Sequence, residues 1–195
     1  MTTHSQGAVE NPRRMLFLYT TLSALMACSA ISTDLYLPGL PSIESQMGGN
    51  IELTITGFLI GFAIAQLIWG PVSDRIGRKI PLMLGMAIFA VGSAGCALAS
   101  TTTELVLWRL VQAVGACVGP MLARAIVRDM YQGVRAAQVL STLVLIMAIA
   151  PIAGPLLGGF LVVSGGWRLT FWAIVTISAV ILLLVFFLPE SLPEN

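Results

Sequence analysis

Six long apolar runs alternate with short polar connections along the chain. The runs cover residues 15–37, 53–72, 80–100, 105–123, 139–163 and 170–188. Each contains about 19 to 25 residues, and a helix that rises about 1.5 Å per residue then crosses a hydrocarbon core of roughly 30 Å. The pattern predicts an all-α membrane protein with six transmembrane helices.

Polar residues flank this predicted bundle. Residues 1–14 form a polar leader, and the run after them is too long for a secretory signal peptide and lacks a small-residue cleavage site. We therefore interpret residues 15–188 as one six-helix transmembrane bundle, and residues 189–195 as the start of a cytoplasmic central linker.

The composition supports this interpretation. Hydrophobic residues make up 57% of the chain and charged residues 10%, with a mean hydropathy of +0.92. This leaves too little polar surface to cover a soluble globule. The net charge of +1 gives no reason to expect nucleic acid as a partner.

The basic residues set the predicted orientation. Short loops rich in Lys and Arg are retained in the cytoplasm. Six spans place both termini on one side, and eight cations fall on that side against Arg168 alone on the other: Arg13, Arg14, Arg75, Arg78, Lys79, Arg124, Arg128 and Arg135. Both termini are therefore predicted to be cytoplasmic.

Two charged residues lie inside the predicted spans. Asp34 comes late in the first span and Arg109 early in the fourth, so they share a depth in the outer part of the bilayer. Ionisable residues there are costly and usually face a bundle interior or a water-filled cavity. The alternative is that Asp34 merely ends a helix at the headgroups and Arg109 extends its side chain to the surface.

The Asp34 carboxyl has the chemistry that a proton-coupled carrier needs. Its proton affinity depends on whether Arg109 is near and whether water is admitted. If a cationic or polar substrate competes with the proton for Asp34, binding of one expels the other, and exchange follows from linkage.

The fifth run contains two prolines in phase with two glycines. Pro151 and Pro155 each remove a backbone donor, so we expect the helix to bend there. Gly154 and Gly158 form a bare face that another helix can approach closely. Ordinary helix association through small residues is the alternative explanation.

Together these stretches resemble the N-terminal six-helix half of a major facilitator superfamily transporter, and within it the drug/proton antiporters of the Bcr/CflA type. The connection after the second run is similar to the superfamily's loop motif at Gly70, Asp74, Arg75, Gly77, Arg78 and Lys79. Residues 105–115 resemble its fourth-helix motif, with Ala113 where Gly is usual. The fifth run is like its antiporter motif at Pro151, Gly154, Pro155, Gly158 and Gly159, with Ala150 where Gly is usual. Residues 33–38 and 127–129 are similar to stretches frequent in the Bcr/CflA branch.

The resemblance implies a fold, a location and a function. Each half of such a transporter is a 3+3 inverted repeat, and substrate lies between the two halves. The implied function is proton-driven efflux of small drugs across the bacterial inner (plasma) membrane, with protons and membrane lipid as the other partners. It needs a second six-helix half, no cofactor beyond the proton gradient, and no nucleic acid.

The resemblance also assigns roles to residues. Proton coupling and substrate binding are expected of Asp34, Arg109, Gln112 and Tyr36, with Met26 as a further wall residue. The cytoplasmic gate is expected to comprise the loop motif together with Arg128 and Asp129, with Arg78 paired to Asp129. The fifth-helix motif is expected to bend and seal against a partner helix.

Two other functions remain open at this point. A proton-coupled solute symporter would use the same fold, although symporters generally lack the fifth-helix motif. A membrane assembly module would transport nothing and would tolerate Asn at position 34. We predict no enzyme, because the sequence shows no nucleophile arrangement, metal-ligand constellation or phosphate-binding glycine loop.

Overall fold

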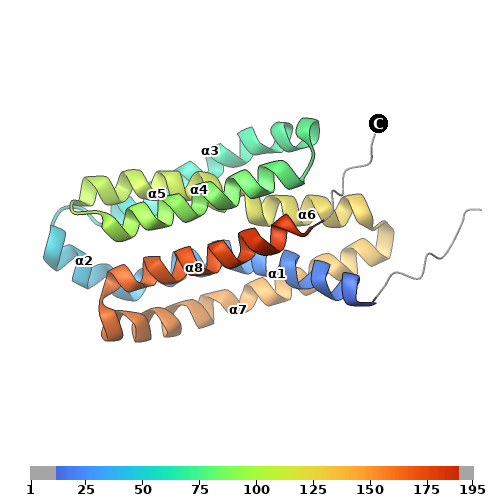
Figure 1. Ribbon diagram of the computed structural model, residues 1–195. Helices are drawn as coiled ribbons and strands as arrows, with labels where there is room; N and C mark the ends of the chain where they lie inside the picture. Colours follow the sequence, from blue (N-terminus) through green and yellow to red (C-terminus); the bar gives the residue numbers. More distant parts are fainter. Residues whose placement is uncertain (1–11, 189–195) are drawn as a thin grey trace, which may run out of the picture.

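The structure is a computed structural model that describes residues 12–188, with side chains from Met15 onward. These residues form eight α-helices and one 3-10 turn, and the long helices lie side by side in one bundle (Figure 1). The elements are α1 (Pro12–Asp34), η1 (Leu37–Gly39), α2 (Leu40–Met47), α3 (Glu52–Ile76), α4 (Lys79–Leu98), α5 (Thr102–Ala116), α6 (Val118–Met130), α7 (Gly133–Gly165) and α8 (Trp167–Phe186).

Six described segments are long and apolar enough to cross a membrane, which confirms the predicted number of spans. They are Met15–Met47, Glu52–Ile76, Lys79–Leu98, Thr102–Met130, Gly133–Gly165 and Trp167–Phe186. We call the end with the α3–α4 and α6–α7 connections the basic end, because most of the Lys and Arg residues flank these connections. The other end, which holds α2, is the α2 end (Figure 1).

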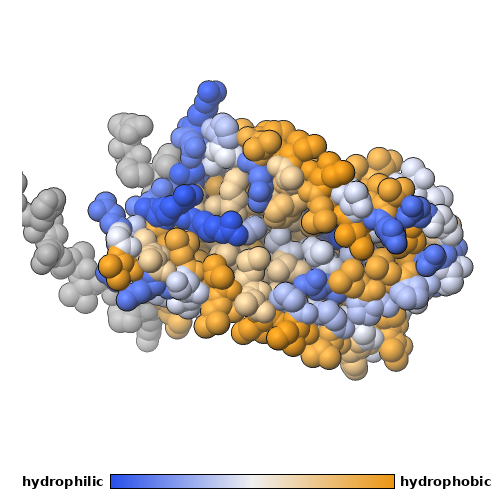
Figure 2. Space-filling model, turned by 180° about the vertical axis from the view of Figure 1, so that it is seen from behind, coloured by the Kyte–Doolittle hydropathy of each residue, from blue (hydrophilic) through white to orange (hydrophobic). Residues whose placement is uncertain are grey.

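The outer surface of the bundle matches a membrane environment. On the face shown in Figure 2, strongly hydrophobic residues lie above and below a paler band that crosses the middle, and the most hydrophilic residues gather toward the two ends. Large apolar side chains point outward from α3 and α7, among them Leu67, 78% exposed, and Val163, 89% exposed. Such a surface is stable against lipid or other helices but not against water.

The first span differs from its predicted form. The run over residues 15–37 was expected to be one helix, but α1 ends at Asp34 and the chain continues through η1 into α2. Pro38 and Pro41 stand in the first turns of η1 and α2, where the missing N–H costs nothing. A separate helix over residues 40–47 was not predicted.

The fourth span is divided into α5 and α6 at Cys117. Pro120 explains the break, because it has no N–H for the carbonyl of Ala116 and its ring crowds that turn. Just before it, Gly119 allows a close approach to α1: a Cβ atom there would lie 2.8 Å from the carbonyl oxygen of Leu25. The prediction of one continuous helix over residues 105–123 is therefore wrong in detail.

The N-terminus of α5 shows how local sequence sets the helix boundaries. The Thr101 side chain accepts a hydrogen bond from the Glu104 amide at 3.2 Å, and the Glu104 carboxylate accepts one from the Ser100 amide at 2.8 Å. The arrangement resembles a capping box, except that the Glu104 carboxylate accepts from the residue before the N-cap. It fixes the start of α5, and therefore the position of Arg109 two turns later.

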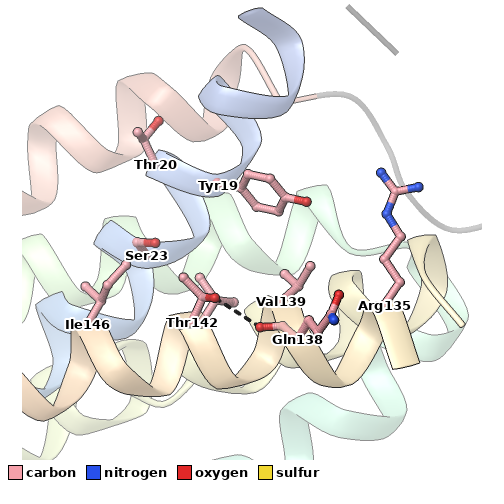
Figure 3. A pocket seen from close by; sticks show the side chains of 9 residues that line it. Tyr19, Thr20, Ser23, Arg135, Gln138, Val139, Thr142 and Ile146 are labelled. Atoms are coloured by element: carbon pink, nitrogen blue, oxygen red, sulfur yellow. Dashed lines mark hydrogen bonds between the residues drawn. The ribbon is translucent and has the colours of Figure 1, made fainter. Parts of the chain in front are cut away.

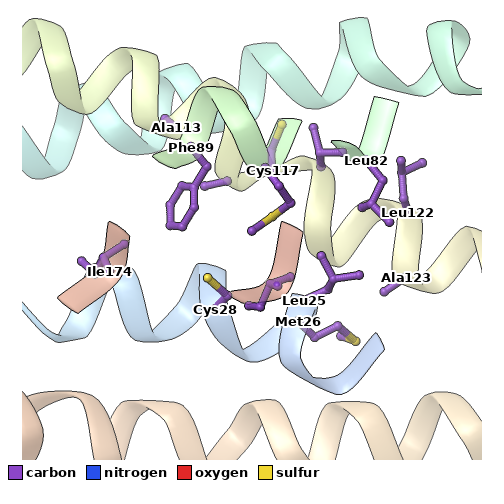
Figure 4. Close-up of a cluster of buried hydrophobic side chains, with 14 of the residues drawn as sticks. Leu25, Met26, Cys28, Leu82, Phe89, Ala113, Cys117, Leu122, Ala123 and Ile174 are labelled. Carbon is purple, nitrogen blue, oxygen red and sulfur yellow. The ribbon is translucent and has the colours of Figure 1, made fainter. Parts of the chain in front are cut away.

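The core lies where α1 passes between the other helices (Figure 4). Leu25, Met26 and Cys28 of α1 are buried there beside Phe89 of α4 and Cys117. All three cysteines, Cys28, Cys96 and Cys117, are buried free thiols, as expected for small apolar side chains. Predictions about residues 1–11 and 189–195 lie outside the described part of the chain.

Candidate functional site

At the basic end, Arg78 lies at the centre of a polar network that joins α3 to α6. Its Nε donates to Asp129 Oδ2 at 2.9 Å, and its Nη1 donates to Ser73 Oγ at 2.9 Å and to Asp74 Oδ1. Arg78 is only 9% exposed. The predicted Arg78–Asp129 pair is therefore present, and the same guanidinium also holds Asp74.

The electrostatics of this network favour the charged form of Arg78. Burial alone lowers the pKa of the guanidinium, but the hydrogen bonds and charges of Asp129 and Asp74 outweigh burial and raise the pKa above its usual value. Gly77 makes the geometry possible, because its φ of +91° turns the chain from α3 into α4. The network is a stable connection between two helices.

The other residues of the loop motif surround this network but are more exposed than Arg78. Asp74 has a side chain that is 65% exposed, although one of its oxygens meets Arg78. Arg75 and Arg128 are exposed, and Lys79 lies 5.7 Å from the centre of the Phe186 ring. A Cβ atom on Gly70 would meet nothing within 4 Å. The outer part of the loop motif is thus open to a further partner.

Nearer the α2 end, Arg109 of α5 is completely buried in a cage of aromatic rings. Its guanidinium carbon lies 4.1 Å from the centre of the Tyr36 ring, 4.4 Å from that of Phe58 and 6.0 Å from that of Phe171. Rings of this kind attract a desolvated cation by up to about 2 kcal/mol each. The alternative in which Arg109 extends its side chain to the surface is excluded.

The polar contacts of Arg109 are incomplete. Nη1 donates to Gln112 Oε1 at 2.7 Å, and Gln112 Nε2 donates to Ser93 Oγ of α4 at 2.8 Å. Nε and Nη2 of Arg109 have no hydrogen-bond partner among the described residues. A buried polar group without a partner destabilises a folded protein by about 1–3 kcal/mol. Burial of these two nitrogens therefore lowers the stability of the bundle.

One hydrogen bond places the Tyr36 ring over Arg109. The Tyr36 hydroxyl lies 3.2 Å from Thr54 Oγ1, and Thr54 itself donates to the carbonyl of Ile51 at 2.6 Å. This contact ties the segment after α1 to the start of α3. Residues of α3, α5 and α8, and of the segment between α1 and η1, therefore meet at the Arg109 guanidinium.

Asp34 is the last residue of α1, and it lies against the glycine face of α7. A Cβ atom on Gly154 would fall 2.6 Å from the Cβ of Asp34, and one on Gly158 would fall 2.0 Å from the carbonyl oxygen of Leu35. Only glycine permits this approach. The predicted bare face of the fifth span therefore meets the end of α1, whereas Gly159 faces open space.

The structure does not join Asp34 directly to Arg109. No ion pair links them among the described side chains, and Asp34 is partly exposed while Arg109 is not. They are connected through the chain, because Tyr36 follows Asp34 by two residues and its ring covers Arg109.

The predicted wall residues do not line an open surface in this structure. Tyr36, Met26 and Gln112 were expected to line a substrate cavity, but each is fully buried within the bundle. Their side chains fill the spaces between helices, where Gln112 also packs beneath Gly92 of α4. Among the described residues they contribute to the Arg109 environment and to the core rather than to an open surface.

Sequence analysis did not identify Thr54, Phe58, Phe171 or Ser93 as parts of this environment. Each stands in an apolar span at a position that also suits an ordinary core residue. The presence of a buried arginine was a sign that aromatic and hydroxyl groups from other spans would surround it. Which of the many candidates do so depends on how the helices pack.

Comparison with solved structures defines the class of the fold. The bacterial proton:xylose symporter XylE superimposes with a TM-score of 0.82 at 17% identity, over 93% of this chain and 46% of XylE. A bacterial homologue of the human lysosomal transporter Spinster gives 0.81 at 18% identity, over 95% of this chain and 45% of the homologue. The bundle has the architecture found in about half of a membrane transporter.

The sequence assigns the chain to a family. It belongs to the Major Facilitator Superfamily, whose family model matches residues 22–195. The MFS-type transporter YdgK of Bacillus subtilis (strain 168) is 36% identical over 193 residues, which cover 95% of this chain and 48% of YdgK. The multidrug resistance protein MdtL of Escherichia fergusonii is 36% identical over 174 residues, 87% of this chain and 44% of MdtL. The chain thus spans about half the length of these relatives.

Proposed function

We propose that this chain is the N-terminal half of a proton-driven drug exporter of the Bcr/CflA type. Its similarity to MdtL, a multidrug resistance protein, supports drug efflux as the activity. The fifth-span motif with Gly154 and Gly158 supports antiport rather than symport. A second six-helix half, from further sequence or from another chain, completes the substrate cavity.

We place the protein in the bacterial inner membrane with the basic end in the cytoplasm. The cations that flank the α3–α4 and α6–α7 connections support this orientation, because such loops remain on the cytoplasmic side. Both termini are then cytoplasmic. The Arg78 network lies near the cytoplasmic surface, and Asp34 and Arg109 lie in the outer part of the bilayer.

The observation that carries the proposal is the position of Asp34 between α1 and α7. Its carboxyl is the only acidic group in α1, and it contacts α7 where glycine leaves no spare space. Gain of a proton removes a charge from this interface and favours a different packing of α1 against α7. A cationic drug that competes with the proton for Asp34 then couples its own exit to proton entry.

Arg109 supports this exchange as a fixed positive charge. Its aromatic cage and Gln112 hold the guanidinium in place. When Asp34 gains or loses a proton, a movement of the following segment displaces the Tyr36 ring from the Arg109 guanidinium. Its Nε and Nη2, which have no hydrogen-bond partner among the described residues, supply donors for a carboxylate or a water molecule in another state of the cycle.

The network at the basic end acts as one side of a gate in this proposal. Asp74 lies in the last turn of α3, where the helix dipole disfavours a negative charge by a few tenths to about 1 kcal/mol. Its exposed carboxylate is then stabilised by the N-terminus of a helix in the second half. Arg78, which is itself paired with Asp129 of α6, holds Asp74 in position for that contact.

The test measures drug accumulation in energised cells. The protein is expressed from its own gene, with any sequence that follows Asn195, in a host that lacks its main exporters. Ethidium and chloramphenicol are supplied with and without a protonophore. We expect lower accumulation than in empty cells, an effect that the protonophore abolishes and that Asp34→Asn also abolishes. Glu44→Gln is the matched control, because Glu44 is an exposed carboxylate at the α2 end.

The other outcomes each have a meaning. Higher accumulation of a solute in expressing cells, again lost with a protonophore, indicates a symporter. Accumulation equal to that of empty cells across the panel, at a membrane level confirmed by immunoblot, contradicts the proposed efflux. A full effect in the Asp34→Asn variant contradicts the role of Asp34 while leaving efflux itself in place.

A further inference from the structure

Several serine and threonine hydroxyls in the long helices donate to a carbonyl of their own helix. Thr142 shows this ordinary contact in the groove between α1 and α7, where its Oγ1 donates to the Gln138 carbonyl at 3.0 Å (Figure 3). Ser93 of α4 makes the same contact with the Phe89 carbonyl at 2.7 Å. It also accepts a hydrogen bond from Gln112 Nε2 of α5 at 2.8 Å. Ser93 therefore connects α4 to a polar side chain of another helix.

The number of available protons fixes the direction of these hydrogen bonds. A serine hydroxyl has one hydrogen, and Ser93 donates it to the Phe89 carbonyl, which can only accept. Toward Gln112, Ser93 can therefore only accept, so the amide must present its NH₂ group there. At the other end of the amide, the Arg109 guanidinium has donors alone and needs the amide oxygen, which lies 2.7 Å from Nη1. Both neighbours thus require the same orientation of the Gln112 amide.

The side chains in this series of hydrogen bonds are closed to water. Ser93, Gln112 and Arg109 are each fully buried, and Cys96 Sγ lies 4.0 Å from Gln112 Oε1. Without the Ser93 hydroxyl, the amide NH₂ loses its described acceptor in a place where water does not replace it. The amide is then free to rotate, and exchange of its oxygen and nitrogen would set NH₂ donors against the Arg109 donors. The position of the guanidinium therefore depends on the Ser93 hydroxyl.

Backbone contact holds Ser93 and Gln112 at this distance. Gly92, the neighbour of Ser93, lies so close to α5 that a Cβ atom there would fall 2.5 Å from the backbone nitrogen of Gln112. From the other side, a Cβ atom on Gly115 of α5 would meet the backbone nitrogen of Phe89. Glycines on both helices thus allow an approach in which backbone lies against backbone. The two helices support the hydrogen bonds as a closely packed pair.

We propose that Ser93 is a positioning residue for the exchange of drug and proton. It acts through Gln112, whose amide oxygen it directs to the Arg109 guanidinium. The guanidinium carbon of Arg109 lies 4.1 Å from the centre of the Tyr36 ring, so a displaced guanidinium also changes its contact with the segment that follows Asp34. The inference rests on the proposed function, because efflux is the activity that Arg109 serves in that proposal.

The first test measures the transport rate per folded molecule. The protein is expressed from its own gene with any sequence that follows Asn195, purified, and reconstituted in vesicles with an imposed proton gradient. Size-exclusion chromatography determines the folded amount. We expect Ser93→Ala to lower the rate of ethidium transport about fivefold, the factor that corresponds to loss of one typical hydrogen bond. A merely structural role would lower the folded amount and leave the rate per folded molecule unchanged.

Ser164→Ala is the matched control. The exposed Ser164 hydroxyl donates to the Phe160 carbonyl of its own helix, also at 2.7 Å, and this described contact stays within α7. The same change of side chain should therefore alter the transport rate by less than about twofold. Equal losses in Ser93→Ala and Ser164→Ala overturn the inference.

The second test measures whether Ser93 acts through Gln112. Melting temperatures are compared for the wild type, Ser93→Ala, Gln112→Leu and the double variant. Once the amide is absent, Ser93 has lost the donor from which it accepts, so Ser93→Ala should shift the melting temperature less than about half as far in the Gln112→Leu background. Equal shifts in the two backgrounds overturn the inference.

The transport assay separates this inference from the proposed function. A wild type that transports ethidium, together with a Ser93→Ala variant of unchanged rate per folded molecule, overturns the role of Ser93 and leaves efflux in place. A wild type that transports none of the drugs tested contradicts the proposed function itself, and the role of Ser93 falls with it.

Discussion

Two arginines show how differently one side chain is used at the two ends of this bundle. Arg78 at the basic end meets two carboxylates and a serine hydroxyl, and nearly all of its charge is balanced by near neighbours. Arg109 is more deeply buried, yet its Nη1 donates to the neutral Gln112, and its Nε and Nη2 stay unpaired among the described residues.

The difference separates a stabilising contact from a costly one. A buried ion pair that is broken by loss of one partner destabilises the protein by several kcal/mol, because the other charge remains. A buried cation without a carboxylate is itself an energetic burden, which the aromatic rings only partly offset. Arg78 is thus expected to matter mainly for stability, and Arg109 mainly for activity.

The largest effect is expected from Arg109→Gln, which tests the functional side of this comparison. Removal of the unpaired guanidinium should reduce drug efflux at least about tenfold, which corresponds to a loss of roughly 1.4 kcal/mol or more. The free energy of unfolding should change by no more than about 1 kcal/mol, since lost ring contacts and removed unpaired donors offset each other. Efflux assays and thermal unfolding in detergent measure the two quantities. If Arg109→Gln lowers the free energy of unfolding by several kcal/mol, and efflux falls only in proportion to the folded protein that is lost, the functional role of Arg109 is contradicted.

Gly158→Ala tests whether the close contact between α7 and the backbone of Leu35 holds Asp34 in its position. The added Cβ would lie 2.0 Å from the carbonyl oxygen of Leu35, and a backbone atom cannot move aside cheaply. Overpacking of this kind costs about 1–3 kcal/mol and should also impair efflux. Gly159→Ala is the control, because a Cβ atom there meets nothing within 4 Å. Equal thermal stability of the two variants would show that α1 and α7 separate easily.

Arg78→Gln tests the stability side of the comparison. Loss of the charge leaves Asp129 partly buried without its partner, and we expect a loss of about 1–3 kcal/mol. Arg75→Gln, at an exposed neighbour, should change stability by less than about 0.5 kcal/mol. Thermal unfolding of both variants provides the comparison, and an equal effect in both would indicate a general charge effect.

The same contact has a defined pH dependence. Because the pKa of Arg78 is raised in the folded state, its contribution is complete below the pKa of the unfolded chain and is lost only as pH rises through the higher folded value. That loss falls in strong base. The difference between wild type and Arg78→Gln should therefore stay constant between about pH 6 and pH 9. Thermal unfolding across that range checks this expectation.

The smallest effect is expected from Thr54→Val, which releases the Tyr36 ring from α3. Loss of this hydrogen bond should cost about 1 kcal/mol and lower efflux less than Arg109→Gln does. Thr176→Val is the control, since the exposed Thr176 bonds only to its own helix. An unchanged efflux rate in Thr54→Val, with the expected loss of stability, would limit Thr54 to a structural role.

Much of the fold could be predicted because the membrane imposes strong local rules. Apolar runs of spanning length determine the six spans. The Lys and Arg residues in the connections indicate which connections lie together at one end of the bundle. The wrong predictions are the helix boundaries near prolines that lie within or just after an apolar run. Pro120 divides the fourth span, and the chain after Asp34 turns into a separate short helix.

The chain's own residue order determined its membrane class, its six spans and the presence of two costly charges, Asp34 and Arg109. These depend on local hydropathy and spacing. Only the tertiary structure decided that Arg109 lies in a cage of three rings, from α3, α8 and the segment after α1, and that the glycine face of α7 meets the end of α1. Such contacts join residues far apart in the chain, and helical phase alone leaves open which faces meet.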